Sequence, residues 1–167
     1  GITKERADAF GVRSQERLAK AYANEQIQPD LVPIATRSTS SGWGLATADQ
    51  PPRPETTLAG VADLKTPFRP HGRVTAANAS PLTDGATAAL VAAEEVAAEL
   101  GLSAKMRLVD YSFAGVDPET MGVGPIPATE RVLARTGLNM DDIGLIEINE
   151  AFAVQVIAFL EHFGIDD

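Results

Sequence analysis

The clearest pattern in the chain is a short apolar run followed by a longer one, with a polar residue between them. The run Ile143–Ile148 is short and rich in β-branched side chains, which predicts a strand. Residues 151–160 are apolar almost all round and long enough for a buried helix. Asn149 stands between the two runs, where the strand is expected to turn into the helix. Such a junction holds a side chain firmly and adds free backbone N–H groups and positive potential.

Asn149 has two interpretations on its chemistry alone. Its amide is neutral at every pH, so it cannot be an acid, a base or a nucleophile, but it can hold a water or donate to a developing oxyanion. It can also be the N-cap of the following helix, a far commoner role for asparagine. Phe152 stands where a capping box would need Glu or Gln, so no capping box supports the second interpretation. The residues alone leave both open.

Four other helices are predicted from apolar stripes and capping residues. They cover residues 3–24 with Thr3 as N-cap, residues 57–64, an alanine-rich stretch from Thr83 or Asp84 to Leu100, and residues 128–135. Gly101 and Gly137 are expected to end the last two helices at the C′ position. Gly11 weakens the first helix by roughly 1 kcal/mol relative to alanine.

The remaining pattern predicts strands and loops. Strands are expected over residues 31–36 and, from alternation, over Lys105–Phe113, and a turn over residues 68–75 is expected to enter another strand. Residues 38–54, rich in Ser, Thr, Gly and Pro, predict a long irregular loop in which Trp43 argues against complete disorder. Glycines and prolines predict a second irregular loop of defined shape over residues 117–128.

Small residues dominate the stretch Ala76–Ala86 before the alanine-rich helix. Small side chains there allow an extended ligand to approach the backbone closely. The alternative is a tight connection packed against a neighbouring subunit or domain. Sequence pattern does not separate these two possibilities.

Composition narrows the classes of function. A chain of 167 residues with 44% hydrophobic and 22% charged residues is typical of one soluble globular domain. The net charge of −9 argues against nucleic acid and anionic membranes as main partners. Glu94 and Glu95 interrupt the most apolar run, so no membrane span is expected, and no signal peptide is visible, which predicts a cytoplasmic protein.

The absence of cysteine excludes disulfides, thiolate metal sites and a cysteine nucleophile within these residues. His71 and His162 lie far apart in the chain and make no ligand pair, so no metal site is predicted. His71 lies in a Pro-His-Gly turn and is expected to be an exposed turn residue.

Four separated stretches resemble the thiolase family, in the family's order along the chain. They are residues 2–10, residues 74–80 with 84–86, residues 117–128, and residues 147–153, which contain Asn-Glu-Ala-Phe. Asp49, Pro52–Arg53 and Thr56–Thr57 also resemble the family's loop region. The sequences of the last two stretches resemble the degradative 3-ketoacyl-CoA thiolases more than the biosynthetic acetoacetyl-CoA enzymes.

The resemblance implies an α/β fold with the layered αβαβα architecture of thiolases, of which these residues are an incomplete part. It implies a coenzyme A thioester as substrate, with no covalently bound cofactor. By this likeness Asn149 would hold the water that, with a histidine, stabilises the enolate of acetyl-CoA. Ala76 and Ser80 would lie along the pantetheine arm, and Met121 and Phe152 would line the acyl and pantetheine pocket.

Two departures from the family pattern affect that site. Ala77 and Pro81 stand where the family usually has glycine, and proline fixes φ and removes an N–H, so the pantetheine wall is expected to be reshaped. The family's acyl-accepting cysteine lies upstream, and its second cysteine and Gly-His-Pro histidine lie downstream; the chain contains none of them. We therefore expect residues 1–82 to be part of the CoA-binding loop domain, 83–103 the last helix of the N-terminal half, and 104–167 the start of the C-terminal half.

Three functions follow as alternatives. The first is a segment of a thiolase, degradative or biosynthetic, acting on acyl-CoA and acetyl-CoA. The second is a CoA- or acyl-binding protein without catalysis, and the third is a structural module whose helix 84–100 packs in a subunit interface. The family further implies a homo-dimer or tetramer, and membership of a fatty acid β-oxidation complex.

We predict that these 167 residues alone do not catalyse thiolysis, because covalent catalysis needs a nucleophile and a base, and the family's cysteines and Gly-His-Pro histidine are not among these residues. The measurement is thiolysis of acetoacetyl-CoA by the isolated chain at high concentration. Turnover above the buffer rate that survives repurification would contradict the prediction.

Overall fold

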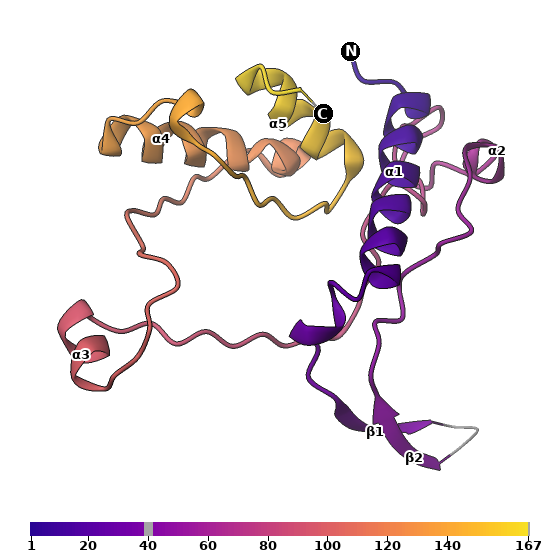
Figure 1. Cartoon of the computed structure of the whole chain (residues 1–167). Helices are drawn as coiled ribbons and strands as arrows, with labels where there is room; N and C mark the ends of the chain where they lie inside the picture. The colour runs from indigo at the N-terminus through magenta and orange to yellow at the C-terminus, as the bar shows by residue number, and fades with distance from the viewer. Residues whose placement is uncertain (39–41, 167) are drawn as a thin grey trace. The chain divides into compact units, whose positions relative to one another are not determined.

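The computed structural model describes residues 1–38 and 42–166 (Figure 1). These residues divide into two compact units. The first contains residues 1–81 and 149–158, and the second contains residues 82–148 and 159–166. Helix α5 (Ala153–Phe163) contributes residues to both units.

The first predicted helix is confirmed as α1 (Lys4–Ala23), the longest helix described. The Thr3 hydroxyl accepts a hydrogen bond from the Arg6 N–H at 3.2 Å, so Thr3 is the N-cap that the sequence predicts. The short helix α2 (Leu58–Val61) lies inside the predicted range, and the Thr57 hydroxyl caps it by accepting from the Gly60 N–H. The buried apolar side chains of this unit come mainly from α1 and α5: Ala7, Phe10, Val12, Val61, Ala153, Val156 and Ile157.

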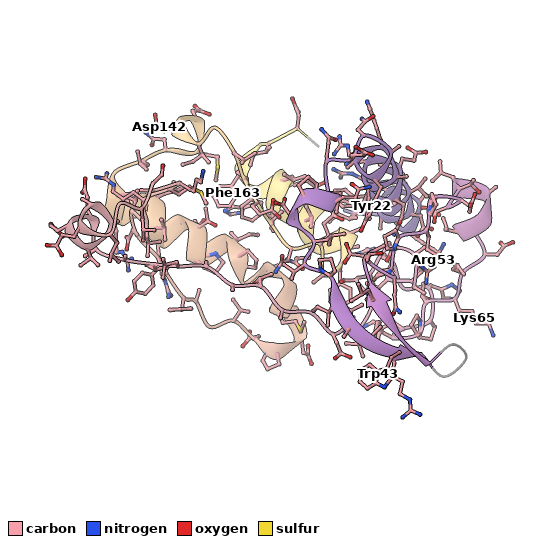
Figure 2. All side chains as sticks on the ribbon, turned by 60° about the horizontal axis from the view of Figure 1, so that its bottom comes forward. Tyr22, Trp43, Arg53, Lys65, Asp142 and Phe163 are labelled. Carbon is pink, nitrogen blue, oxygen red and sulfur yellow. The ribbon has the colours of Figure 1, made fainter. Side chains whose placement is uncertain are left out.

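A β-hairpin replaces part of the predicted loop. Strand β1 (Ile34–Ser38) pairs antiparallel with β2 (Gly42–Ala46), and Ile34 lies opposite Ala46. The prediction of an irregular loop over residues 38–54 was therefore wrong at residue 38 and at residues 42–46, and its residues 39–41 lie outside the described residues. The predicted first strand begins later than expected, because Pro33 has no N–H to donate to a ladder. Trp43 is 75% exposed and projects from the hairpin in Figure 2.

The strand expected after the turn at residues 68–75 is also absent. Residues 68–78 form turns and bends, and the backbone pairs only at a single bridge between Ala79 and Phe152. His71 is an exposed turn residue, as predicted, with a left-handed φ of 54°.

The long alanine-rich helix is much shorter than predicted. Only α3 (Glu94–Glu99) is helical, and residues 82–93 run as an extended trace (Figure 1). Their side chains, such as those of Leu82, Leu90 and Val91, are exposed. Helices gain most of their stability from packing an apolar face, so a strong intrinsic propensity without such packing is insufficient. Gly101, at a φ of 65°, ends α3 at the predicted place.

The strands predicted over residues 105–113 and 143–148 are not formed, which corrects both predictions. Both segments are free of helix, but the described residues offer them no hydrogen-bonded neighbour strand. A strand exists only through its ladder with a neighbour. Without a neighbouring strand, the apolar side chains of the first segment are exposed on both faces: Met106, Leu108, Val109, Tyr111 and Phe113.

The helix predicted over residues 128–135 is confirmed and is longer than expected. Helix α4 covers Pro125–Thr136, begins at a proline suited to a first turn, and ends at Gly137 with a φ of 71°. Before it lies the 3-10 helix η2 (Pro118–Val123), within the segment predicted to be irregular. Two further 3-10 helices are η1 (Gln28–Asp30) and η3 (Met140–Asp142), the latter with a capping box between Asn139 and Asp142.

Arginines of α4 hold the extended segment of the second unit. Arg131 donates to the Phe113 carbonyl at 2.7 Å, and Arg135 forms an ion pair with Asp110 and donates to the Tyr111 carbonyl. The Arg135 guanidinium lowers the pKa of the Asp110 carboxyl. The stabilisation from this pair is therefore present above the ordinary pKa of aspartate and is lost as the pH falls through the lowered pKa.

No helix in the described ranges is long and apolar enough to cross a membrane. No group of three or more His, Cys, Asp or Glu residues is placed to hold a metal ion among residues 1–38 and 42–166.

We predict that the isolated chain does not unfold as a cooperative monomer. The apolar side chains of residues 82–113 are largely exposed and two extended segments lack strand partners, so little packing opposes local opening. Sedimentation with differential scanning calorimetry tests this. A sharp transition in a sample shown to be monomeric would contradict it.

Candidate functional site

A buried polar cluster joins α1 to the loop at residues 75–78 in the first unit. Asp8, Thr75 and Asn78 are the buried polar side chains recorded for the described residues. Asp8 faces Lys4 one helical turn earlier, and their charged atoms lie 2.6 Å apart. Lys4 also donates to the Ala62 carbonyl at 2.8 Å, so this ion pair connects α1 with the end of α2. A buried carboxylate needs such partners, because an unpaired buried charge is very costly.

Asn78 connects this carboxylate to the loop before Ser80. Its Nδ2 donates to Asp8 Oδ1 at 2.7 Å and to the Arg73 carbonyl at 2.9 Å. Its Oδ1 accepts from the Thr75 N–H at 2.8 Å. Both amide donors and the acceptor are therefore used, and one side chain closes the turn and fastens it to α1.

The same loop forms a short ladder with the Asn-Glu-Ala-Phe stretch. The Ser80 N–H donates to the Ala151 carbonyl and the Ala153 N–H donates to the Asn78 carbonyl, each at 2.9 Å. These two bonds flank the bridge between Ala79 and Phe152. In an antiparallel pair of this kind the flanked residues approach closely, so Phe152 lies beside the small-residue loop.

Gly11 allows α1 to lie against this loop. A Cβ added at Gly11 would meet the Ala77 carbonyl oxygen at 2.5 Å and the Asn78 Cα at 3.3 Å. Both atoms belong to the backbone, so neither can move aside cheaply. The glycine that weakens α1 on propensity grounds is thus needed for a close approach.

A second contact joins α1 to the Asn-Glu-Ala-Phe stretch directly. The Ser14 hydroxyl donates to Glu150 Oε2 at 2.5 Å. Farther along α1, Gln15 Oε1 accepts from the Arg53 N–H at 2.8 Å, and the Tyr22 hydroxyl donates to Asp49 at 2.6 Å. The hydrogen bond to Asp49 raises the pKa of the Tyr22 phenol.

Asn149 is not the N-cap of the following helix. Helix α5 begins at Ala153, and the Phe152 carbonyl accepts the first bonds of the helix, from the Gln155 and Val156 N–H groups. Asn149 lies before this start, is exposed, and makes no side-chain hydrogen bond with the described residues. The structure therefore excludes the capping interpretation and leaves the Asn149 amide available to a water or a ligand.

The other predicted site residues divide between the two units. Ala76 and Ser80 are exposed on the small-residue loop, and Phe152 is half-buried across the bridge, so these three lie with Asn149 in the first unit. Met121 is exposed on η2 in the second unit. The bridge brings the loop of Ala76 and Ser80 to the segment of Phe152 and Asn149; the binding roles of all five residues stay predictions.

Sequence reasoning missed the residues that hold this arrangement together, namely Lys4, Asp8, Ser14, Thr75 and Asn78. A signal for them exists in α1. One face of the helix carries five residues at helical spacing: Lys4, Asp8, Gly11, Gln15 and Tyr22. That face is polar, so a search for an apolar stripe assigns it to solvent, whereas in the structure it contacts residues 49–78.

The second unit has a separate apolar pocket of about 320 Å³. It lies along α4 and the 143–146 segment and is lined by Ser112, Ala128, Thr129, Val132, Leu133, Met140, Ile143, Leu145, Ile146 and Phe159. Met121 is not among its lining residues. The pocket therefore gives no support to the predicted role of Met121.

Comparison with known proteins identifies the family. Residues 1–95 match the profile described as "Thiolase, N-terminal domain", and residues 102–167 match "Thiolase, C-terminal domain". The chain belongs to the thiolase family, as its motifs predict.

Two curated relatives illustrate the extent of the match. The chain is 43% identical over 166 residues to the "3-oxoadipyl-CoA/3-oxo-5,6-dehydrosuberyl-CoA thiolase" of Escherichia coli (strain K12), covering 99% of this chain and 41% of that protein. It is also 43% identical over 164 residues to the "Acetyl-CoA acetyltransferase" of Syntrophomonas wolfei, covering 98% and 41% of the two chains. The chain thus spans about two fifths of the length of these relatives.

Solved structures agree with the sequence comparison. The human mitochondrial 3-ketoacyl-CoA thiolase matches with a TM-score of 0.91 and 34% identity, covering 99% of this chain and 42% of that chain. The same enzyme solved in complex with CoA matches with a TM-score of 0.88 and 34% identity, covering 99% of this chain and 40% of that one. The predicted α/β thiolase fold, present in part, is confirmed.

We predict that Gly11→Ala destabilises a full-length thiolase that contains these 167 residues, obtained by exchanging them for the matching segment of the E. coli relative. Alanine gains up to about 1 kcal/mol in helix propensity, but the clash with the Ala77 carbonyl costs about 1–3 kcal/mol. The measurement is the free energy of unfolding in denaturant. Ala9→Gly, at an exposed position of α1, is the control that measures propensity alone. A more stable Gly11→Ala protein would contradict the prediction.

Proposed function

We propose that this chain is a segment of a thiolase that transfers an acyl group between coenzyme A thioesters. The reaction is thiolytic cleavage of a 3-ketoacyl-CoA to acetyl-CoA and a shortened acyl-CoA through an acyl-cysteine. The catalytic cysteines and histidine lie outside these residues. The observation that carries the proposal is the bridge that joins the small-residue loop to the Asn-Glu-Ala-Phe stretch, because it gathers four of the five predicted site residues in one unit.

In this proposal the loop binds and Asn149 assists the chemistry. Ala76 and Ser80 present small, exposed side chains along which the pantetheine arm lies, and Phe152 supplies an apolar wall across the bridge. Met121 lines the acyl pocket, as the thiolase resemblance implies. Asn149 holds a water that donates to the enolate oxygen, so its amide stabilises negative charge that develops in the transition state and is absent from the bound thioester.

The exposed, unpartnered amide of Asn149 supports this role. The buried Asn78 amide uses its hydrogen-bonding groups within the protein, whereas an exposed amide keeps them for water or a ligand. Asn149 instead leaves its donors and acceptor open next to the segment that carries Phe152.

A thiolase-like protein that binds CoA without catalysis is the main alternative, and a biosynthetic acetoacetyl-CoA thiolase is the second. The gene around this chain separates enzyme from binding protein. Codons for an upstream cysteine and for a downstream Gly-His-Pro and cysteine would support the enzyme, and their absence would favour the binding protein. Relatives named as 3-oxoadipyl-CoA thiolase and as acetyl-CoA acetyltransferase are equally identical to the chain, so relative rates on acetoacetyl-CoA and longer 3-ketoacyl-CoA thioesters decide between the two enzymes.

The wider setting follows from the same proposal. The whole protein would be a cytoplasmic homo-dimer or tetramer that acts in fatty acid β-oxidation. Within the chain, the proposed division is residues 1–82 for the CoA-binding loop domain, 83–103 for the last helix of the N-terminal half, and 104–167 for the start of the C-terminal half.

We expect Asn149→Ala to lower kcat of the full-length enzyme by roughly 10²–10³, the usual effect of losing an oxyanion contact. The melting temperature should stay nearly unchanged, because Asn149 is exposed and caps no helix. The measurements are kcat, KM for the acyl-CoA and the melting temperature, side by side.

Thr57→Ala is the control. The exposed Thr57 hydroxyl caps α2 by accepting from the Gly60 N–H, so its loss should cost about 1 kcal/mol of stability and leave kcat intact. If Asn149→Ala turns over normally, the proposed role of Asn149 is wrong.

A further inference from the structure

The Asn149 side chain makes no hydrogen bond with the residues that the structure describes, so the backbone on either side of it determines where its amide lies. On its C-terminal side that backbone is residues 150–153, which enter α5 at Ala153. Hydrogen bonds from the Ser80 N–H and to the Asn78 carbonyl hold residues 151–153. The position of Asn149 therefore depends on the loop that carries Asn78.

The Asn78 side chain in turn fixes that loop. It is 4% exposed, and it bonds to Asp8 on α1, to the Arg73 carbonyl and to the Thr75 N–H. Its own carbonyl accepts the bond from the Ala153 N–H that opens α5. One residue thus fastens the turn to α1 with its side chain and fastens the Asn149 segment with its backbone.

We infer that Asn78, held by Asp8, is a positioning residue for Asn149. The inference rests on the proposed role of Asn149 and adds the contacts that keep it in place. Asn78 touches no reacting atom; it acts through the backbone of residues 78–80 and 151–153. The bond between Ser14 and Glu150 gives α1 a second contact with the same segment.

The chemistry at residue 78 requires a neutral amide. Asp8 already has Lys4 as its counter-charge at 2.6 Å, and it needs a donor, not a second carboxylate, at 2.7 Å on its other oxygen. Asn78→Asp keeps the size and the acceptor for the Thr75 N–H but loses both donors and places like charges side by side. The loop must then move away from α1.

The test is whether the effect of Asn78 on kcat of the full-length enzyme depends on the presence of Asn149. Asn78→Asp should lower kcat by about 10- to 100-fold, since small displacements of a catalytic group have effects of that size. In the Asn149→Ala background the same change should alter kcat by less than about twofold, because the group that it misplaces is already gone. Losses that multiply in the double variant would overturn the inference.

Amide hydrogen exchange gives a second measurement that does not depend on activity. In Asn78→Asp the N–H groups of Ser80 and Ala153 should exchange faster, while that of Gly137, bonded to Leu133 in the second unit, should be unchanged. Unchanged exchange at Ser80 and Ala153 would also overturn the inference.

Two further variants separate positioning from general stability and from failure of the proposed function. Thr3→Ala removes the N-cap of α1, the helix that carries Asp8, and should lower the melting temperature with kcat unchanged. If Asn78→Asp does not fold, Asp8→Asn is the milder variant, because it keeps an acceptor for the Asn78 amide. It should lower kcat by a smaller factor, and this loss should also be absent in the Asn149→Ala background. Losses in kcat that multiply in the Asp8→Asn, Asn149→Ala double variant would overturn the inference. If Asn149→Ala alone leaves kcat intact, the proposed function fails, and the exchange rates still decide whether Asn78 holds the segment.

Discussion

The buried carboxylate of Asp8 is the constraint around which the first unit is arranged. It is 4% exposed and has Lys4 on one oxygen and Asn78 on the other. Removing one partner of such a buried pair typically costs about 3–5 kcal/mol, which exceeds the contribution of most single apolar contacts. The loop must therefore place Asn78 against α1, and Gly11 must be small enough to allow it.

That arrangement carries an advantage for a site that must be rigid. A buried polar network whose members are all satisfied specifies one geometry, whereas an apolar contact tolerates sliding. No buried side-chain nitrogen or oxygen in the described ranges lacks a partner. Because Asn78 belongs to this network, the hydrogen-bonded ladder between residues 78–80 and 151–153 is held in one geometry as well. The exposed Asn149 lies two residues before this ladder in the chain.

The second unit is held differently. Arg131 and Arg135 of α4 fasten the extended segment at Asp110–Phe113 through exposed contacts, which are individually weak in water. The apolar side chains along residues 82–113 lie mostly open. The backbone nevertheless follows a thiolase structure closely over nearly the whole chain, with a TM-score of 0.91. Its extended segments thus have the path of a thiolase without the ladder that would make them strands.

Local chemistry determined part of this structure from the sequence alone. The cap at Thr3, the glycines that end α3 and α4, and the apolar α5 were predictable because each depends on residues within a few positions of one another. The motifs also identified the family. Three predictions were wrong: the strands at 105–113 and 143–148 and the long helix at 84–100. A strand needs a neighbouring strand and a helix needs a packed apolar face, and neither is a property of the segment itself. Only the tertiary structure showed that Asp8, Asn78 and Ser14 hold the Asn149 segment. Their partners are up to 136 residues away in the chain, and a polar helix face looks like a solvated one until its partner is in place.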